Sequence, residues 1–350
     1  MSQEKELQSG ETIVSDGLET LEKEVVEIMS CLQEVLAKSS RPELAEALPW
    51  LGKQTEHKLD PSSTAQAYSI SFQLLDMIED QVALVTKRER EQHLGPEAEK
   101  GLWPRKLASL KKHGYSGKEI AEVIQSVRVE PVFTAHPTEA KRPSVRERHR
   151  ELYDLLSRLE SPSYSAQEKD RAKTDLLASL EALWLTGEIH VEKPTVEKEL
   201  RNVLFYLREV FPSTLEHLDR HLKWSWKHIG FDPKELTAAG DGPEMRFGLW
   251  IGGDRDGHPF VTSDVTRDTL NELRHQALKL YNKELASAAD HLSVSEKSHP
   301  VPESLAKRIN ELINELGDEG RSIQTRNPEE PWRCFTYLLR AYLRTHADIS

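Results

Sequence analysis

The sequence predicts a mainly α-helical protein that also contains two short β-strands. Apolar residues recur at three- and four-residue spacing over most of the 350 residues, which is the period of one helix face. Only two segments, 127–134 and 246–251, replace that period with β-branched and aromatic residues. Breaks rich in proline, glycine and serine separate the periodic segments, so the helices are expected to be joined by short loops.

The helical period begins near the N-terminus. Leu18, Leu21 and Val25 start a pattern that continues to Leu36, and residues 64–92 repeat it. Further helices are expected over residues 104–113, 117–127, 139–160, 167–190, 196–225, 263–294, 302–316 and 331–347.

Each strand segment is interpreted as a short buried strand that leads into a polar loop and then a helix. Ligands bind at such strand ends in α/β proteins, because helix N-termini converge there. Two strands cannot close a sheet. Either the chain is essentially all-α, or these strands belong to a barrel completed by sequence that is not present here.

Composition narrows the function classes. The formal net charge of −12 disfavours binding to nucleic acid or to an anionic membrane, so an anionic substrate needs a local basic pocket. Two cysteines, Cys31 and Cys334, are too few for a disulfide framework. No apolar run approaches the ~20 residues of a membrane helix, and the N-terminus lacks the pattern of a signal peptide. A cytoplasmic protein without membrane or nucleic-acid partners is expected.

The first candidate site follows the first strand. His136 precedes Pro137 and Thr138, which suit the start of a helix, and Arg142 lies in the next turn. A helix N-terminus with guanidinium groups binds anions, and a nearby histidine can transfer a proton at neutral pH. The alternative is a capped helix with a solvated basic face and a histidine that fills space.

The second candidate site follows the second strand. Gly252 and Gly253 allow the backbone to approach a ligand closely, and Arg255 lies between Asp254 and Asp256, which are expected to hold it. A guanidinium suits bidentate binding of phosphate or carboxylate. The alternative is a tight turn with a local ion pair. A calcium loop is disfavoured because a third oxygen ligand and the closing glutamate are missing.

Residues 184–195 form a third stretch, which is best interpreted as a buried helix end followed by a proline-directed turn. His217 and His221 lie four residues apart on a predicted helix. Without a third ligand, surface histidines are favoured over a metal site.

Taken in order, the three stretches resemble the phosphoenolpyruvate carboxylase family. They read TAHPTEAKR (134–142), WLTGEIHVEKPT (184–195) and GGDRDGHPFVT (252–262). Residues 65–80 and 331–344 are also similar to helices of that family, so the resemblance covers essentially the whole chain. It identifies the chain as the N-terminal part of a divergent, bacterial-type member.

Several residues depart from the family pattern. Pro143 replaces a second arginine, Gly187 and His190 replace an acidic and a basic residue, and His258 replaces asparagine. Lys198 lies where an aspartate is common. These departures mark the chain as divergent.

The resemblance implies a β/α barrel surrounded by helices. Residues 1–126 would form an N-terminal helical region, and 127–350 would begin the catalytic barrel with long helical insertions. Family members are much longer, and their second active-site loop, catalytic lysine and acidic metal ligands lie in the C-terminal half. The chain is therefore expected to be a truncated piece of a longer enzyme, without metal ligands of its own and inactive alone.

The activity implied is that of a lyase that carboxylates phosphoenolpyruvate with bicarbonate, giving phosphate and oxaloacetate for the tricarboxylic acid cycle. The implied cofactor is Mg²⁺ or Mn²⁺, and the implied full-length assembly is a homotetramer. His136 and Arg255 are the expected catalytic residues, and Arg142 and Thr138 the substrate-binding residues. The supporting residues would be Gly252, Gly253, Asp254 and Asp256.

Two other functions remain open on the sequence. One is a non-catalytic helical regulatory or assembly module that keeps the motifs as structure, and the other is a different enzyme that handles phosphoryl groups. Sequence beyond Ser350 discriminates them, because a glycine-rich loop with a histidine and an arginine there supports the carboxylase.

Overall fold

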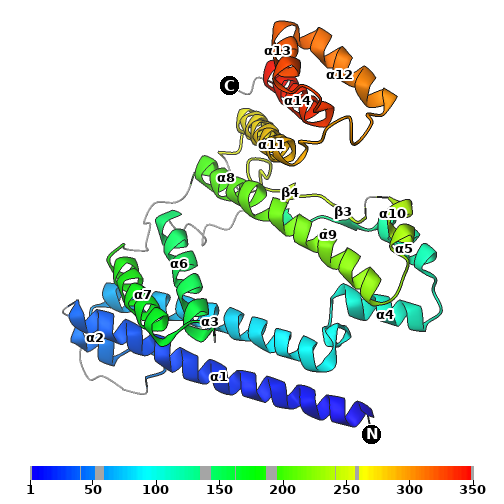
Figure 1. Ribbon diagram of the computed structural model, residues 1–350. Coiled ribbons are helices and arrows are strands. Elements are labelled where there is room, and N and C mark those ends of the chain that lie inside the picture. Colours follow the sequence, from blue (N-terminus) through cyan, green and yellow to red (C-terminus); the bar gives the residue numbers. More distant parts are fainter. Residues whose placement is uncertain are drawn as a thin grey trace. The chain divides into compact units, whose positions relative to one another are not determined.

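The computed structural model describes residues 2–39, 41–51, 59–134, 143–161, 163–186, 195–240, 242–256 and 260–347. The chain divides into two compact units, each assembled from several segments (Figure 1). Unit 1 consists of Met1–Val127, Pro137–Lys193 and Asp219–Glu244. Unit 2 consists of Arg128–His136, Pro194–Leu218 and Met245–Ser350.

The larger core of unit 1 lies among long helices, with α1 and α3 side by side (Figure 1). Leu32, Ile70 and Leu74 are fully buried in it. Asp60 begins α3 because its Oδ2 accepts a hydrogen bond from the Ser63 backbone N at 2.9 Å. The helices around this core are α1 (Ser2–Lys38), α2 (Pro42–Glu46), α3 (Pro61–Leu94), α6 (Pro143–Glu160) and α7 (Ala166–Thr186).

A second core in unit 1 surrounds Trp226, which is fully buried and donates from Nε1 to the Asp232 carbonyl at 2.9 Å. Ser116 and Glu119 form a reciprocal capping box that begins α5. The helices here are η1 (Pro96–Ala98), α4 (Trp103–Lys112), α5 (Gly117–Ser126), the second half of α9 (Phe211–His228) and α10 (Pro233–Ala239).

Unit 2 is built around the remaining helices and the strands. Leu312, Leu338 and Ala341 are fully buried where the last three helices meet. The helices of this unit are α8 (Val196–Phe205), η3 (Tyr206–Val210), the start of α9, α11 (Ser263–His291), α12 (Glu303–Leu316), α13 (Asp318–Arg326) and α14 (Pro331–Ala347).

The two predicted strand segments pair in parallel. Strands β1 (Arg128–Val129) and β3 (Glu244–Met245) pair, as do β2 (Val132–Phe133) and β4 (Gly248–Leu249). The backbone N atoms of residues 244, 246, 248 and 250 donate to the carbonyls of 127, 129, 131 and 133 at 2.9–3.0 Å. One ladder therefore runs through both pairs, and it is interrupted at Pro131 because proline has no N–H to donate.

The strands are less buried than the sequence predicts. Phe133, Leu249 and Ile251 pack against the apolar face of α8. Val132 and Trp250, on the opposite face, are about half exposed, at 49% and 50%. The expectation of buried strands is wrong for this face, because in the described part of the chain each segment pairs only with the other and one layer of helix covers them.

The helix expected over 196–225 continues to His228 but contains a π-turn at η3. The backbone N of Phe211 donates to the Tyr206 carbonyl, five residues back. Pro212 explains the turn, because its ring removes one helical N–H and crowds the carbonyl four residues earlier. A wider turn just before the proline relieves that contact.

The structure confirms the predicted fold class, a mainly α-helical chain with two short strand pairs. Helices α2, α10 and α13 were not predicted. Helix α13 has a weak signal because Ile323 is its one large buried apolar residue. The division at residues 126 and 127, and the completion of a barrel, stay predictions. In the described part of the chain, no helix has the length and apolar character needed to span a membrane.

Truncating Leu32 tests the core between α1 and α3. We expect Leu32→Ala to lower the free energy of unfolding of unit 1 by about 3 kcal/mol, because it leaves a cavity in a fully buried site. The matched control is Val26→Ala on the same helix, where the side chain is 47% exposed and the expected loss is below ~0.5 kcal/mol. Urea unfolding followed by circular dichroism measures both, and equal losses would contradict the assigned core.

Candidate functional site

The two predicted motifs begin at the same end of the strand pair. Because β2 and β4 are parallel and in register, Phe133 and Leu249 lie opposite each other at their C-terminal ends. The Trp250 backbone N then donates to the Phe133 carbonyl at 2.9 Å. Thr134, which starts the first motif, thus leaves the sheet beside the loop of the second motif.

The predicted site residues of the first motif lie outside the described part of the chain. They are His136, Thr138 and Arg142, and His258 also lies outside it. Their roles stay predictions. What is described is the loop that starts at Gly252, which lies wholly within unit 2.

Gly252 is required by the shape of this loop. Its φ of +73° is in the left-handed region, and a Cβ there would lie 2.2 Å from Oγ1 of Thr269 on α11. Gly253 meets no such restriction, since a Cβ would lie 3.7 Å from its nearest neighbour. The sequence had suggested that Gly252 allows a ligand to approach the backbone. In this structure it is helix α11 that approaches the backbone closely at Gly252.

The aspartates beside Arg255 do not hold its guanidinium. Asp254 Oδ1 accepts a hydrogen bond from the Asp256 backbone N at 3.0 Å and so closes the turn. Among the described contacts, neither carboxylate forms an ion pair with Arg255. In this geometry Asp254 is turned back onto its own loop, and the supporting role of the two aspartates stays a prediction.

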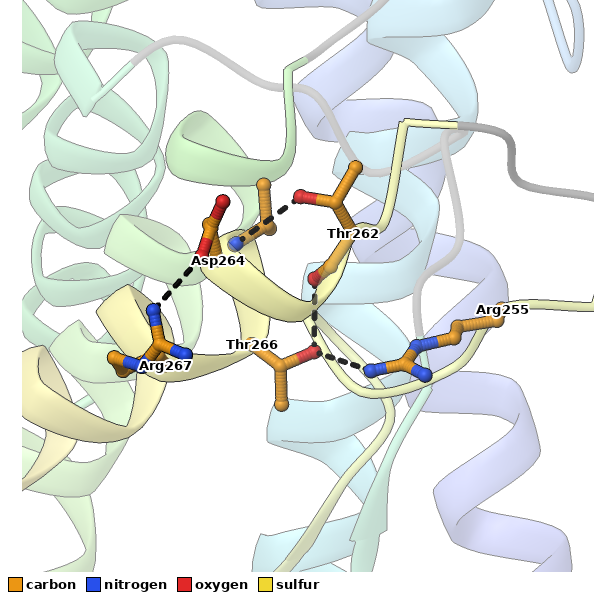
Figure 2. A network of polar contacts seen from close by, with 6 residues as sticks. Arg255, Thr262, Asp264, Thr266 and Arg267 are labelled. Atoms are coloured by element: carbon orange, nitrogen blue, oxygen red, sulfur yellow. Dashed lines mark hydrogen bonds and ion pairs between the residues drawn. The ribbon is translucent and has the colours of Figure 1, made fainter.

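Arg255 instead reaches the first turns of α11 (Figure 2). Its Nη2 donates to Oγ1 of Thr266 at 3.5 Å. The Thr266 hydroxyl in turn donates to the Gly252 carbonyl at 2.7 Å. Thr262 caps the same helix by accepting from the Val265 backbone N at 3.3 Å. One threonine hydroxyl thus joins the glycine turn, the arginine and the helix start.

Thr266 was not predicted from the sequence. Its one signal is the spacing from Thr262, because a second hydroxyl four residues after an N-cap returns to the same side of the helix. An aromatic cluster at the strand pair was not predicted either. Phe211 contacts Phe133 and Phe247 at ring-centroid distances of 5.8 Å and 4.4 Å, so the π-turn region braces the strand pair.

The third stretch and the histidine pair are described only in part. Trp184 packs on the core of unit 1, and its carbonyl accepts from Gln66 Nε2 at 2.7 Å. Thr195 caps α8, while residues 187–194 lie outside the described part of the chain.

His221 stacks on Trp224, and burial, with Lys87 nearby, lowers its pKa. Among the described residues, no three His, Cys, Asp or Glu side chains form a group that could hold a metal ion.

The loop at Gly252 exposes the Arg255 guanidinium in a position suited to binding an anion. The Arg255 side chain is exposed at a parallel strand end and next to the N-terminus of α11, and among the described contacts no carboxylate neutralises it. A guanidinium in such a place can donate hydrogen bonds to two oxygens of a phosphate or carboxylate. The helix N-terminus adds to the positive potential.

Comparison with known proteins agrees with these motifs. The family model for phosphoenolpyruvate carboxylase matches residues 8–349. The chain belongs to the phosphoenolpyruvate carboxylase family. It is 33% identical over 331 residues to the phosphoenolpyruvate carboxylase of Methylorubrum extorquens, covering 93% of this chain and 34% of that protein.

Other carboxylases of this family give similar matches. The enzyme of Xanthomonas euvesicatoria is 30% identical over 299 residues, covering 83% of this chain and 31% of that protein. The enzyme of Gloeobacter violaceus is 30% identical over 326 residues, covering 88% and 34%. The chain thus spans about a third of the length of the curated phosphoenolpyruvate carboxylases that it matches.

Alanine at each of the two glycines tests the geometry of the loop. We expect Gly252→Ala to lower the stability of unit 2 by about 2 kcal/mol or more, because it combines a left-handed φ with a clash against Thr269. Gly253→Ala, one residue later, is the matched control and should change stability by less than ~1 kcal/mol. The measurement is urea unfolding with hydrogen exchange across 248–270. If the two variants behave alike, the loop is not packed on α11 as described.

Proposed function

We propose that this chain supplies part of the active site of a phosphoenolpyruvate carboxylase that forms oxaloacetate from phosphoenolpyruvate and bicarbonate. The observation that carries the proposal is the exposed Arg255 guanidinium, which lies at the strand end where two family motifs begin. The activity belongs to the longer protein implied by the family. The cytoplasmic location and the homotetramer remain predictions from the resemblance.

In this reaction a bicarbonate oxygen attacks the phosphorus of phosphoenolpyruvate. The bond from phosphorus to the enol oxygen breaks, leaving carboxyphosphate and the enolate of pyruvate. Carboxyphosphate then loses its proton and breaks down to phosphate and carbon dioxide, and the enolate carbon attacks the carbon dioxide. Negative charge moves between phosphoryl and carboxylate oxygens in every step, and a fixed guanidinium such as that of Arg255 stabilises it.

The remaining roles follow from the first motif. We assign proton transfer from carboxyphosphate to His136, because an imidazole accepts and returns protons near neutral pH. Arg142 would bind the phosphate or carboxylate, and Thr138 would contribute a hydroxyl and a helix start. In the described loop, Thr266 and the Gly252 turn hold Arg255, and Asp254 shapes the turn.

The resemblance also predicts Mg²⁺ or Mn²⁺. The described residues of this chain do not form a ligand group for such an ion. No step assigned to this chain therefore passes through the metal.

A conservative substitution at Arg255 tests the proposal. In the full-length enzyme, Arg255→Lys should lower kcat/KM more than tenfold, about 1.4 kcal/mol of transition-state stabilisation, because an ammonium cannot bind two oxygens in one plane. The matched control is Arg267→Lys on α11, whose exposed pair with Asp264 at 2.8 Å lies outside the loop and should leave kcat/KM unchanged. Oxaloacetate formation is followed by coupled reduction, and melting temperatures are compared.

Two results would overturn the role of Arg255. One is normal kinetics with a sharply lower melting temperature, which makes the arginine a structural residue. The other is an equal kinetic loss in both variants. If the full-length wild-type protein forms no oxaloacetate, the proposed function itself fails and a non-catalytic module is favoured.

A substitution at His136 separates the two stages of the reaction. If the histidine serves the carboxylation stage, His136→Asn in the full-length enzyme should still consume phosphoenolpyruvate slowly but yield pyruvate and phosphate in place of oxaloacetate. The ratio of pyruvate to oxaloacetate is measured with two coupling dehydrogenases. Oxaloacetate formation at the wild-type rate would contradict the assignment, and loss of phosphoenolpyruvate binding would place the histidine in the earlier step.

A further inference from the structure

A cavity of about 530 Å³ lies between α1, α3 and α6, wholly within unit 1. It contains none of the residues of the Gly252–Asp256 loop. Three acceptor side chains line it: Glu24 from α1, Gln81 from α3 and Glu160 from α6. An inference about this cavity does not depend on the proposed function.

Gln81 is the most buried of the three, with 3% of its surface exposed. Its Nε2 donates to the Tyr153 carbonyl at 3.0 Å and to Ser157 Oγ at 2.6 Å, both on α6. A carbonyl oxygen can only accept, so this contact fixes which end of the amide faces Tyr153. The other end, Oε1, is buried, and no described residue donates a hydrogen bond to it. A buried hydrogen-bond acceptor without a donor is uncommon in proteins, so a donor from a bound ligand is expected here.

Glu24 and Glu160 add two carboxyl groups to the same wall of the cavity. Glu160 lies close enough to Glu24 to favour the protonated form of the Glu24 carboxyl group and so to raise its pKa. Burial, together with this contact and the negative charge of Glu160, raises the pKa of Glu24 to about 8. Oε2 of Glu24 is buried and accepts no hydrogen bond from any described residue. Glu24 therefore holds a proton at neutral pH. That proton occupies a position that a positively charged ligand group could take.

The other charges around the cavity favour a cation. Asp16 and Glu89 also line it, against Arg88 as the one basic residue in the lining. Glu24 and Glu160 also border a neighbouring cavity, lined further by Lys23 and Glu27 of α1 and by Lys169, Asp170 and Lys173 of α7. Those lysines do not line the cavity that contains Gln81, whose lining keeps an excess of acidic side chains.

The acceptors specify the kind of cation. Among the described residues no three His, Cys, Asp or Glu side chains form a metal site, which disfavours a divalent metal ion here. A primary ammonium has three N–H donors, which match one amide oxygen and two carboxyl groups. Val82, Leu84 and Val85 line the same cavity and provide an apolar surface for a short alkyl chain.

We propose that the cavity between α1, α3 and α6 binds a small primary ammonium compound, whose nitrogen donates to Gln81 Oε1, Glu24 and Glu160. Binding replaces the proton on Glu24. The protonated carboxyl of the pair releases its proton to solvent, and the ligand ammonium, which stays protonated at this pH, takes its place. Affinity therefore falls as the pH is lowered from about 8 towards 6, by up to ~tenfold per pH unit, because protons then compete for the same carboxylates.

Calorimetry on the 350-residue chain with n-butylammonium chloride tests the site. We expect saturable binding at pH 7 with release of nearly one proton, measured from the binding heats in two buffers of different ionisation enthalpy. Tetramethylammonium at the same ionic strength carries the same charge without N–H donors and should not bind. Absence of saturable butylammonium binding by the folded chain, equal binding of both ions, or binding without proton release would each overturn the proposal.

Glu24→Gln locates the site. It keeps the shape of the side chain but removes the charge, and it should weaken butylammonium binding at least tenfold and abolish proton release. The matched control is Glu22→Gln on the same helix, which lines neither cavity and should bind as the wild type does. Unchanged binding in the Glu24 variant would place the ligand elsewhere. Because proton release is measured on the wild type, the test stands even if that variant unfolds.

Discussion

The ladder between residues 127–133 and 244–250 is the contact on which the candidate site depends. It joins segments that lie more than a hundred residues apart, and the evenly spaced bonds fix their register. A parallel pair ends both strands at one edge, so the two motifs must start there together. This register, which joins residues far apart in the sequence, is what brings Thr134 and the start of the Gly252 loop to the same edge.

The glycine-rich loop shows how a helix can set the position of an arginine. Arg255 is held by the Thr266 hydroxyl, which also binds the Gly252 carbonyl, so α11 determines where the guanidinium lies. At 3.5 Å the bond to Arg255 is long and leaves most of the guanidinium donors exposed. A cation that is aimed but not neutralised suits binding of an anion better than one paired with a carboxylate, because no existing ion pair has to be broken.

The acidic cavity of unit 1 follows a different principle. Where two carboxyl groups lie close together inside a fold, ionisation of both is disfavoured. Gln81 adds a buried oxygen to which no described residue donates a hydrogen bond. Neither the carboxyl pair nor the amide oxygen stabilises the packing of the helices, because apolar side chains would pack there without the cost of burying a polar group. Helices α1, α3 and α6 are stabilised by the fully buried aliphatic residues around Leu32 and Leu74, and that core can carry a polar cavity at its edge.

The sequence by itself determined the long helices, the two strand segments and the motifs of the family, because each depends on a local period or on residues close together in the chain. Thr195 and Thr262 could be read as helix starts for the same reason. Only the tertiary structure decided the rest. The partner of Arg255 lies eleven residues away on a helix, and the three acceptors of the cavity come from three helices. Such contacts depend on how helices pack, which no period within one segment encodes.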